Sequence, residues 1–154
     1  MHLVIAALLV ISLFAPAQAD ASDSQPGMTT VETGQLFKAY EARLKTAIKA
    51  NKMGIVATAC ATCGAKAIGV TIAENRIIMI FNPHFAIRML NASIDAGVEA
   101  PLRLYLTENT DGTAQLRYQK PTAVFAPYGV PDLNAMAAEL DKIVEAIVES
   151  AGNM

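Results

Sequence analysis

The sequence predicts an α+β fold: a curved, mainly antiparallel sheet that carries two long helices on one face. Three observations lead to this prediction. One amphipathic helix pattern follows a first short strand, a second and longer helix pattern ends the chain, and four strand patterns lie between them. The element order is therefore β-α-β(4)-α, and the apolar sides of both long helices are expected to lie against the sheet.

The first residues have the pattern of a cleavable signal peptide. An apolar run extends from Leu3 to Phe14 and leads into the small-x-small sequence Ala17-Gln18-Ala19. This run is shorter than the roughly 20 apolar residues that a membrane span requires. We therefore expect cleavage after Ala19, which removes residues 1–19 and leaves a periplasmic or secreted protein without a membrane anchor.

The mature chain is expected to begin with a flexible polar leader at residues 20–27 and to continue as a single α+β domain at residues 28–154. Met28–Glu32 is the first predicted strand, and Thr33 suits the N-cap of the first long helix. That helix is predicted to end near Asn51. Its apolar residues recur at helical spacing: Leu36, Phe37, Tyr40, Leu44, Ala47 and Ile48.

The middle of the chain is predicted to alternate strands with short helical segments. Gly54–Ala59 is a short strand, and Cys60–Ile68 is a helical turn or a short helix. Arg76–Phe81 is a continuous apolar strand, which the Asn82-Pro83 pair ends. Phe85–Asp95 has weaker helical spacing.

The last two strands are predicted to form a hairpin, followed by the second long helix. Every second residue from Leu102 to Leu106 is apolar, which indicates a strand with one buried face. Asp111-Gly112 suits the turn, and Ala114–Gln119 is the return strand. Pro121–Pro131 is predicted to be an apolar loop. The final helix starts near Asp132, with its apolar residues on one side: Leu133, Met136, Ala137, Leu140, Ile143, Val144 and Ile147.

A thioredoxin-like fold is an alternative with nearly the same list of elements. It would place a dithiol at a strand-to-helix junction, as at Ala59-Cys60, and a cis-proline just before a hairpin, as at Pro101. The segment between Cys63 and Arg76 is short, however, for the long second helix of that fold. The antiparallel arrangement is therefore preferred.

Several landmarks, in this order and spacing, resemble the domain of unknown function 302 family. Met89 falls where that family often has a Leu-Met pair. The other landmarks are Lys52–Val56, Arg76–Phe81 with Asn82-Pro83, Ala100–Leu104, Asp111-Gly112, Tyr118 and Pro121. The resemblance covers most of Met28 to Met154, and it implies a β-α-β(4)-α fold. It implies no activity, because the family has none established. Many members have an Asp-His pair where this chain has Thr58–Cys63, so no role of that histidine transfers.

Cys60-Ala61-Thr62-Cys63 is the strongest chemical signal in the sequence. Two thiols at this spacing lie on one side of a helix start, and a helix N-terminus stabilises a thiolate. Three interpretations stay open. The pair is an inert disulfide formed on export, a thiol–disulfide exchange pair with Cys60 as nucleophile and Cys63 as resolving thiol, or part of a metal site. As a disulfide, so small a loop contributes only about 2 kcal/mol in the chain-entropy model.

His84 is the one histidine after the signal peptide, and it is the candidate third metal ligand. Together with Cys60 and Cys63 it would suit Cu(I) or Zn(II), which accept thiolate and imidazole. A surface or capping role for His84 is the alternative. Gly64 stands where a covalent haem site needs histidine, and no organic cofactor is indicated.

The segment Ala123–Val130 is unusually apolar for a loop. Phe125 and Tyr128 within it, together with Met89, are candidates for lining a pocket or a dimer surface. The same three side chains would otherwise form part of the core. A homodimer is therefore a compatible state.

The composition excludes one function class. With 12 Lys and Arg against 14 Asp and Glu, the net charge is −2, and no basic cluster is present for nucleic acid to bind. The preferred function is a non-enzymatic binding module that holds a small ligand or soft metal ion near Cys60 and Cys63, since the family as a whole lacks the dithiol. A thiol–disulfide oxidoreductase that uses these cysteines, and a structural protein with an inert disulfide, are the alternatives.

Overall fold

The computed structural model describes residues 25–153. The predicted signal peptide and residues 20–24 of the predicted leader lie outside this range. Five strands form one sheet, in the order β1-β5-β4-β3-β2. Their bounds in chain order are β1 Met28–Leu36, β2 Gly54–Cys60, β3 Asn75–Phe81, β4 Leu102–Glu108 and β5 Thr113–Gln119. Each neighbouring pair of strands is antiparallel.

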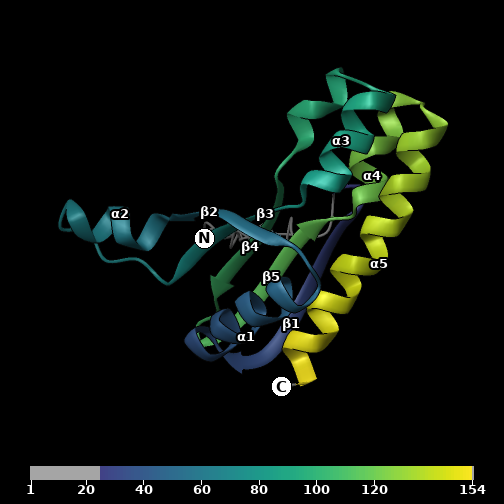
Figure 1. Ribbon diagram of the computed structural model, residues 1–154. Coiled ribbons are helices and arrows are strands. Elements are labelled where there is room, and N and C mark those ends of the chain that lie inside the picture. The colour runs from purple at the N-terminus through teal and green to yellow at the C-terminus, as the bar shows by residue number, and fades with distance from the viewer. Residues whose placement is uncertain (1–24, 154) are drawn as a thin grey trace, which may run out of the picture.

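The helices connect and flank these strands. Two are long, and both pack on the same face of the sheet and against each other (Figure 1). The helical elements are α1 Phe37–Ala50, α2 Ala61–Ala67, α3 Pro83–Ala92, α4 Pro121–Phe125 and α5 Pro131–Asn153, with 3-10 turns η2 Asp95–Glu99 and η3 Ala126–Tyr128. No helix among residues 25–153 has both the length and the apolar character needed to cross a bilayer.

The predicted α+β fold is confirmed, and the thioredoxin-like alternative is excluded. A thioredoxin-like sheet requires parallel neighbours joined by a crossover helix, whereas every pairing here is antiparallel. The Ala100–Pro101 peptide bond is cis, as that alternative expected, but strand direction decides between the two folds.

The core lies between the sheet and the two long helices. Leu104, Leu106 and Leu116 alternate with more exposed neighbours along β4 and β5, and each is at most 1% exposed. They meet Leu44 of α1 and Leu133 of α5 within one buried cluster. Each such side chain contributes about 1.5–3 kcal/mol through burial. The alternate residues of these strands point to the opposite face, which none of the long helices covers.

Two local predictions were wrong. Thr33 does not cap a helix, because β1 continues to Leu36 after a register shift, and the Thr33 hydroxyl instead donates to the Ala114 carbonyl at 2.7 Å. The predicted loop from Pro121 to Pro131 contains α4 and η3. Its first turn is held by Asp141, whose carboxylate accepts hydrogen bonds from the Thr122 amide and hydroxyl.

The segment between β2 and β3 extends away from the rest of the molecule as an arm, residues 60–74 (Figure 1). It consists of α2 and an extended return segment that is mostly exposed. Within the arm, Lys66 and Glu74 are the only charged residues. The arm is therefore exposed yet almost uncharged.

Candidate functional site

Cys60 and Cys63 form a disulfide at the base of the arm, with their Cα atoms 5.2 Å apart. Cys60 ends β2 and caps α2, and its Sγ accepts a hydrogen bond from the Cys63 amide at 2.9 Å. Thr62 ties the turn to the returning chain: its hydroxyl donates to the Ala73 carbonyl and accepts from the Asn75 amide. The predicted position of the pair at a strand-to-helix junction is what the structure has.

The two cysteines differ in exposure. Cys63 is exposed and Cys60 is half-buried. This is the reverse of what the expected order requires, since an attacking thiol is normally the more exposed one. Because Cys63 is exposed, a small thiol can approach it from solvent.

His84 does not join the cysteines. In the β2–β3 register, Cys60 faces Arg76 and Gly54 faces Phe81, so His84 follows the opposite end of β3. Six residue steps along β2 separate these ends, which is roughly 20 Å. Within residues 25–153, no group of three or more His, Cys, Asp or Glu side chains is arranged to hold a metal ion. Cys60, Cys63 and His84 therefore cannot bind one metal ion in this structure, because the length of β3 separates the histidine from the cysteines.

The expected pocket-lining residues are placed mainly in the core. Met89 is 4% and Phe125 2% exposed, and both border a small cavity of about 30 Å³, which is room for one water molecule. Tyr128 packs against Phe125, with ring centroids 6.5 Å apart. Its hydroxyl donates to the Glu99 carboxylate at 2.9 Å. Tyr128 does not line the larger cavity of the molecule, but its hydrogen-bond partner Glu99 does.

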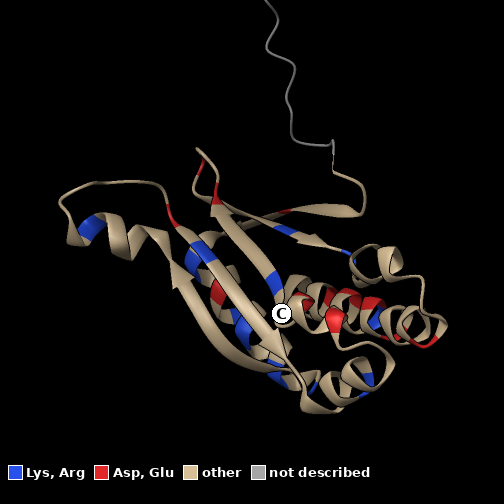
Figure 2. Cartoon of the chain, turned by 90° about the horizontal axis from the view of Figure 1, so that it is seen from above, with Lys and Arg blue, Asp and Glu red and all other residues tan. Residues whose placement is uncertain are grey.

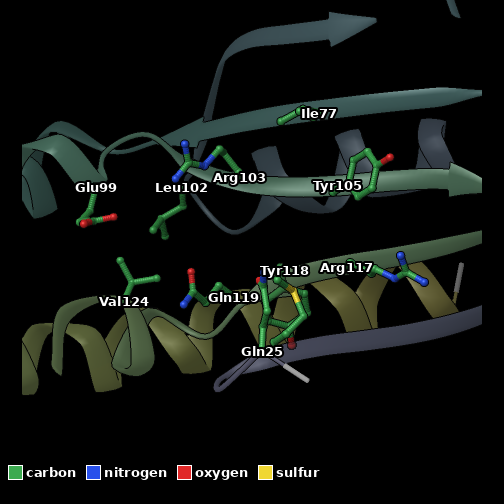
Figure 3. A pocket seen from close by; sticks show the side chains of 11 residues that line it. Gln25, Ile77, Glu99, Leu102, Arg103, Tyr105, Arg117, Tyr118, Gln119 and Val124 are labelled. Carbon is green, nitrogen blue, oxygen red and sulfur yellow. The ribbon is translucent and has the colours of Figure 1, made fainter. Parts of the chain in front are cut away.

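That larger cavity is a hollow of about 450 Å³ on the open face of the sheet, hereafter the open-face hollow. Figure 3 shows its lining side chains, which come from β1, β3, β4, β5, η2 and α4 and from Gln25 at the start of the described chain. The apolar walls are Ile77, Leu102 and Val124. The polar and aromatic lining is Gln25, Glu99, Arg103, Tyr105, Arg117 and Gln119, with Met28 and Tyr118 at one side.

Two arginines of the hollow come from neighbouring strands. Tyr105 faces Arg117 across β4 and β5, and Arg103 lies two residues before Tyr105 on the same face. Arg103 and Arg117 are thus diagonal neighbours, about 7–8 Å apart at the backbone. In Figure 3 their guanidinium groups point in different directions.

Neither guanidinium has an acidic partner. Among residues 25–153, neither Arg103 nor Arg117 takes part in an ion pair, and the buried Nε of Arg117 has no hydrogen-bond acceptor. Glu32, on the adjacent strand, accepts hydrogen bonds from Gln115 and Asn109 instead. These bonds, first that from Gln115, lower the pKa of the Glu32 carboxyl below its ordinary value, and the nearby charge of Arg117 lowers it further although the two side chains form no ion pair.

Acidic and basic side chains are distributed unevenly over the molecule. Figure 2 shows acidic residues gathered along α5 and basic residues on strands of the sheet and on α1. Other arginines of the described chain do have carboxylate partners: Arg76 pairs with Glu74, and Arg88 forms two hydrogen bonds to Glu139. Arg43 of α1 also lacks a carboxylate partner and donates to the Gln35 side chain, so what distinguishes the open-face hollow is that two such arginines line one cavity.

The hollow was not predicted from the sequence. The alternation from Leu102 to Leu106 does place Arg103 and Tyr105 on the outer face, but an arginine on an outer face usually indicates only solvent. Arg117 lies 14 residues further along, and only the β4–β5 register brings it beside Tyr105. The signal that was available, an arginine on each strand of one hairpin, is too common to define a site.

The fold and the hollow define a class: an α+β domain with an antiparallel sheet whose one face is open and carries a cationic cavity. The chain belongs to the DUF302 family, a domain of unknown function, whose family model matches residues 29–151. An uncharacterised conserved DUF302 protein from Bacillus stearothermophilus has the same fold, with a TM-score of 0.74 and 23% sequence identity over 82% of this chain and 99% of the other. No curated protein matches the chain.

Proposed function

We propose that this chain is an exported, non-enzymatic binding module that holds a small organic anion in the open-face hollow. The single observation that carries the proposal is the pair Arg103 and Arg117, which line one cavity and form no ion pair among residues 25–153. The signal-peptide pattern at residues 1–19 supports export.

The chemistry of the hollow suits a carboxylic acid with an apolar body. A guanidinium binds a carboxylate through two parallel hydrogen bonds, and such charge-assisted bonds are the strong ones. Ile77, Leu102 and Val124 offer apolar surface beside these charges. A volume of about 450 Å³ lies within the range of about 300–1,000 Å³ typical of small-molecule sites.

Binding is favoured over catalysis by the lining residues themselves. They include no serine, cysteine or histidine, so the hollow lacks the Ser-His or Cys-His pairing of a nucleophile with a base. Gln25 and Gln119 can donate and accept hydrogen bonds and would orient a ligand without reacting with it.

The test is a nuclear magnetic resonance titration of the mature chain with a panel of small carboxylic acids, each beside its primary amide. Acids, and not amides, should shift the signals of β4 and β5. Arg103→Gln and Arg117→Gln should each weaken binding about tenfold or more, because a hydrogen bond to a charged group contributes about 1.5–3 kcal/mol. Arg43→Gln, on α1 behind the sheet, is the matched control and should bind as the parent does.

The leader needs its own control, because Asp20 and Asp23 carry carboxylates and lie shortly before Gln25. The titration is therefore repeated on a chain that starts at Gln25. If no acid of the panel binds either chain, or if both arginine variants bind as tightly as the parent, the proposal is wrong.

A second candidate function is thiol–disulfide exchange at Cys60–Cys63, supported by the exposure of Cys63 on the arm. A thiolate of a substrate dithiol would attack Cys63 Sγ, which breaks the S–S bond and releases Cys60 as a thiolate. The Cys63 amide already donates to that sulfur. The second substrate thiolate then attacks the mixed disulfide, so the substrate leaves oxidised and the chain leaves as a dithiol.

The reduction potential of the pair tests this candidate. A structural disulfide has a potential below about −300 mV, whereas an exchanging pair has a higher one. Equilibration with glutathione buffers should therefore find a readily reduced pair. A potential below that limit would leave Cys60–Cys63 as an inert bridge, and it would not affect the proposal for the hollow.

A further inference from the structure

Most of the large apolar side chains exposed among residues 25–153 fall into two patches, and Leu36 and Val56 lie outside them. The arm patch is Ile68, Val70 and Ile72, which are 78%, 48% and 42% exposed. The helix patch lies on α3 and η2 and consists of Ile87, Leu90, Ile94 and Val98, of which Ile94 and Val98 are 77% and 76% exposed. Contiguous exposed apolar patches on soluble proteins usually mark an interaction surface.

The strand between the two patches is an open edge. β2 is last in the strand order and pairs only with β3 among the described residues. From Gly54 to Cys60 it has no charged residue and no proline, which are the usual devices that protect an edge. One irregularity, between Ile55 and Ala57, is its only protection, and the adjacent Val56 is 54% exposed.

The two patches lie at opposite ends of this edge. The arm leaves the Cys60 end of β2, whereas α3 begins just after Phe81, which faces Gly54 at the other end. The ends are roughly 20 Å apart. If two copies of β2 pair antiparallel about a two-fold axis, the Cys60 end of one copy lies beside the Gly54 end of the other. The arm patch of each copy then lies on the same side of the dimer as the helix patch of its partner.

We infer that the chain forms a symmetric dimer, in which two β2 edges pair and each arm packs on the α3–η2 surface of its partner. The two-fold axis makes this contact twice and closes the assembly, as isologous dimers do. The charges of the two surfaces are opposite. Lys66, the only charged residue from Gly54 to Ala73, is positive, and Asp95, exposed beside the residues of the helix patch, is negative. This inference does not depend on the proposed ligand of the hollow.

Sedimentation velocity of the mature chain tests the dimer. The parent should sediment as a dimer, and Ile68→Lys and Ile94→Lys should each weaken association at least tenfold. Leu36→Lys is the matched control, because Leu36 is 66% exposed but lies on β1, at the far edge of the sheet. The double variant Ile68→Lys/Ile94→Asp should regain the dimer, since opposite charges then meet at both contacts.

A cross-link reports the strand pairing without a disruptive substitution. The described residues contain no free cysteine, so Thr58→Cys adds one free thiol near the middle of β2. It should form an intermolecular disulfide readily, whereas Glu149→Cys on α5 should not. A monomeric parent, a dimer that both lysine variants leave intact, or equal cross-linking at the two positions would overturn the inference.

Discussion

The Tyr128 hydroxyl donates a hydrogen bond of 2.9 Å to the Glu99 carboxylate, which lines the open-face hollow. This bond raises the pKa of the Tyr128 phenol above its ordinary value of 10.0, because the bond favours the protonated phenol. The same bond holds the carboxylate of Glu99, the only acidic group of the hollow, on the side of η3. Glu99 forms no ion pair with either arginine among the described residues.

Replacement of Tyr128 by phenylalanine should therefore weaken anion binding. Without the hydroxyl, the Glu99 carboxylate is free to pair with Arg103 and to compete with the ligand, and we expect a several-fold weaker affinity for the best acid of the panel. Glu99→Gln should have the opposite effect, because it removes the competing charge. Tighter binding by Tyr128→Phe, measured in the same titration, would contradict this account.

Tyr40 offers a test of the core. It is 1% exposed, and its hydroxyl has no hydrogen-bond partner among residues 25–153. An unpaired buried polar group costs about 1–3 kcal/mol. Tyr40→Phe should therefore raise the free energy of unfolding in urea, by about 1 kcal/mol. Tyr105→Phe is the control, since the Tyr105 hydroxyl accepts a hydrogen bond from Asn75 at 2.6 Å and its loss should not stabilise.

The same residue predicts a loss of stability in alkali. Burial raises the pKa of Tyr40 to about 12, against 10.0 for an exposed tyrosine. Between these values the unfolded chain loses the proton and the folded chain keeps it. The ionisation of Tyr40 therefore leaves the free energy of unfolding unchanged below pH 10.0 and lowers it as the pH rises to about 12. Unfolding midpoints should fall less steeply over this window in Tyr40→Phe; equal slopes would show that Tyr40 is not responsible.

The disulfide should matter little for global stability. It closes a very small loop, and it lies on the arm, outside the buried core. The double substitution Cys60→Ser/Cys63→Ser should lower the free energy of unfolding by no more than about 2 kcal/mol. Hydrogen exchange should accelerate much more in the arm than in β4 and β5. A loss well above this limit, or equal acceleration in the arm and throughout the sheet, would mean that the disulfide supports the whole domain.

Metal binding by the reduced chain should not involve His84. Because His84 follows the far end of β3, any Cu(I) taken up after reduction would be held by Cys60 and Cys63 alone. His84→Ala should therefore leave the affinity for Cu(I) unchanged in a competition titration, whereas Cys60→Ser should abolish uptake. A marked loss of affinity in His84→Ala would require the arm to fold back over the sheet.

Much of the fold could be predicted because its signals are local. The alternation from Leu102 to Leu106 and the apolar stripe of α5 each require one buried face, and the structure buries both. The end of β1 could not be predicted in this way. Gly34 adopts a left-handed φ of 63° beside the register shift, which lets the strand continue to Leu36 although Thr33 is a good helix cap by sequence.

The sites were harder to predict because they depend on distant residues. The turn of α4 requires Asp141, 19 residues after Thr122. The hollow requires the register that sets Arg117 beside Tyr105. In the cysteine region the sequence supplied the chemistry but not the distance, since a histidine one strand away in sequence lies at the other end of that strand in space.

The alternation of β4 and β5 has a consequence for how this domain can change. Leu104 and Leu116 support the scaffold, whereas Arg103 and Arg117, their neighbours in the chain, face the opposite way. Substitutions at the second pair are free to alter what is recognised without disturbing the first. A scaffold of this kind can acquire new specificities one residue at a time, and relatives with one shape need not share one ligand.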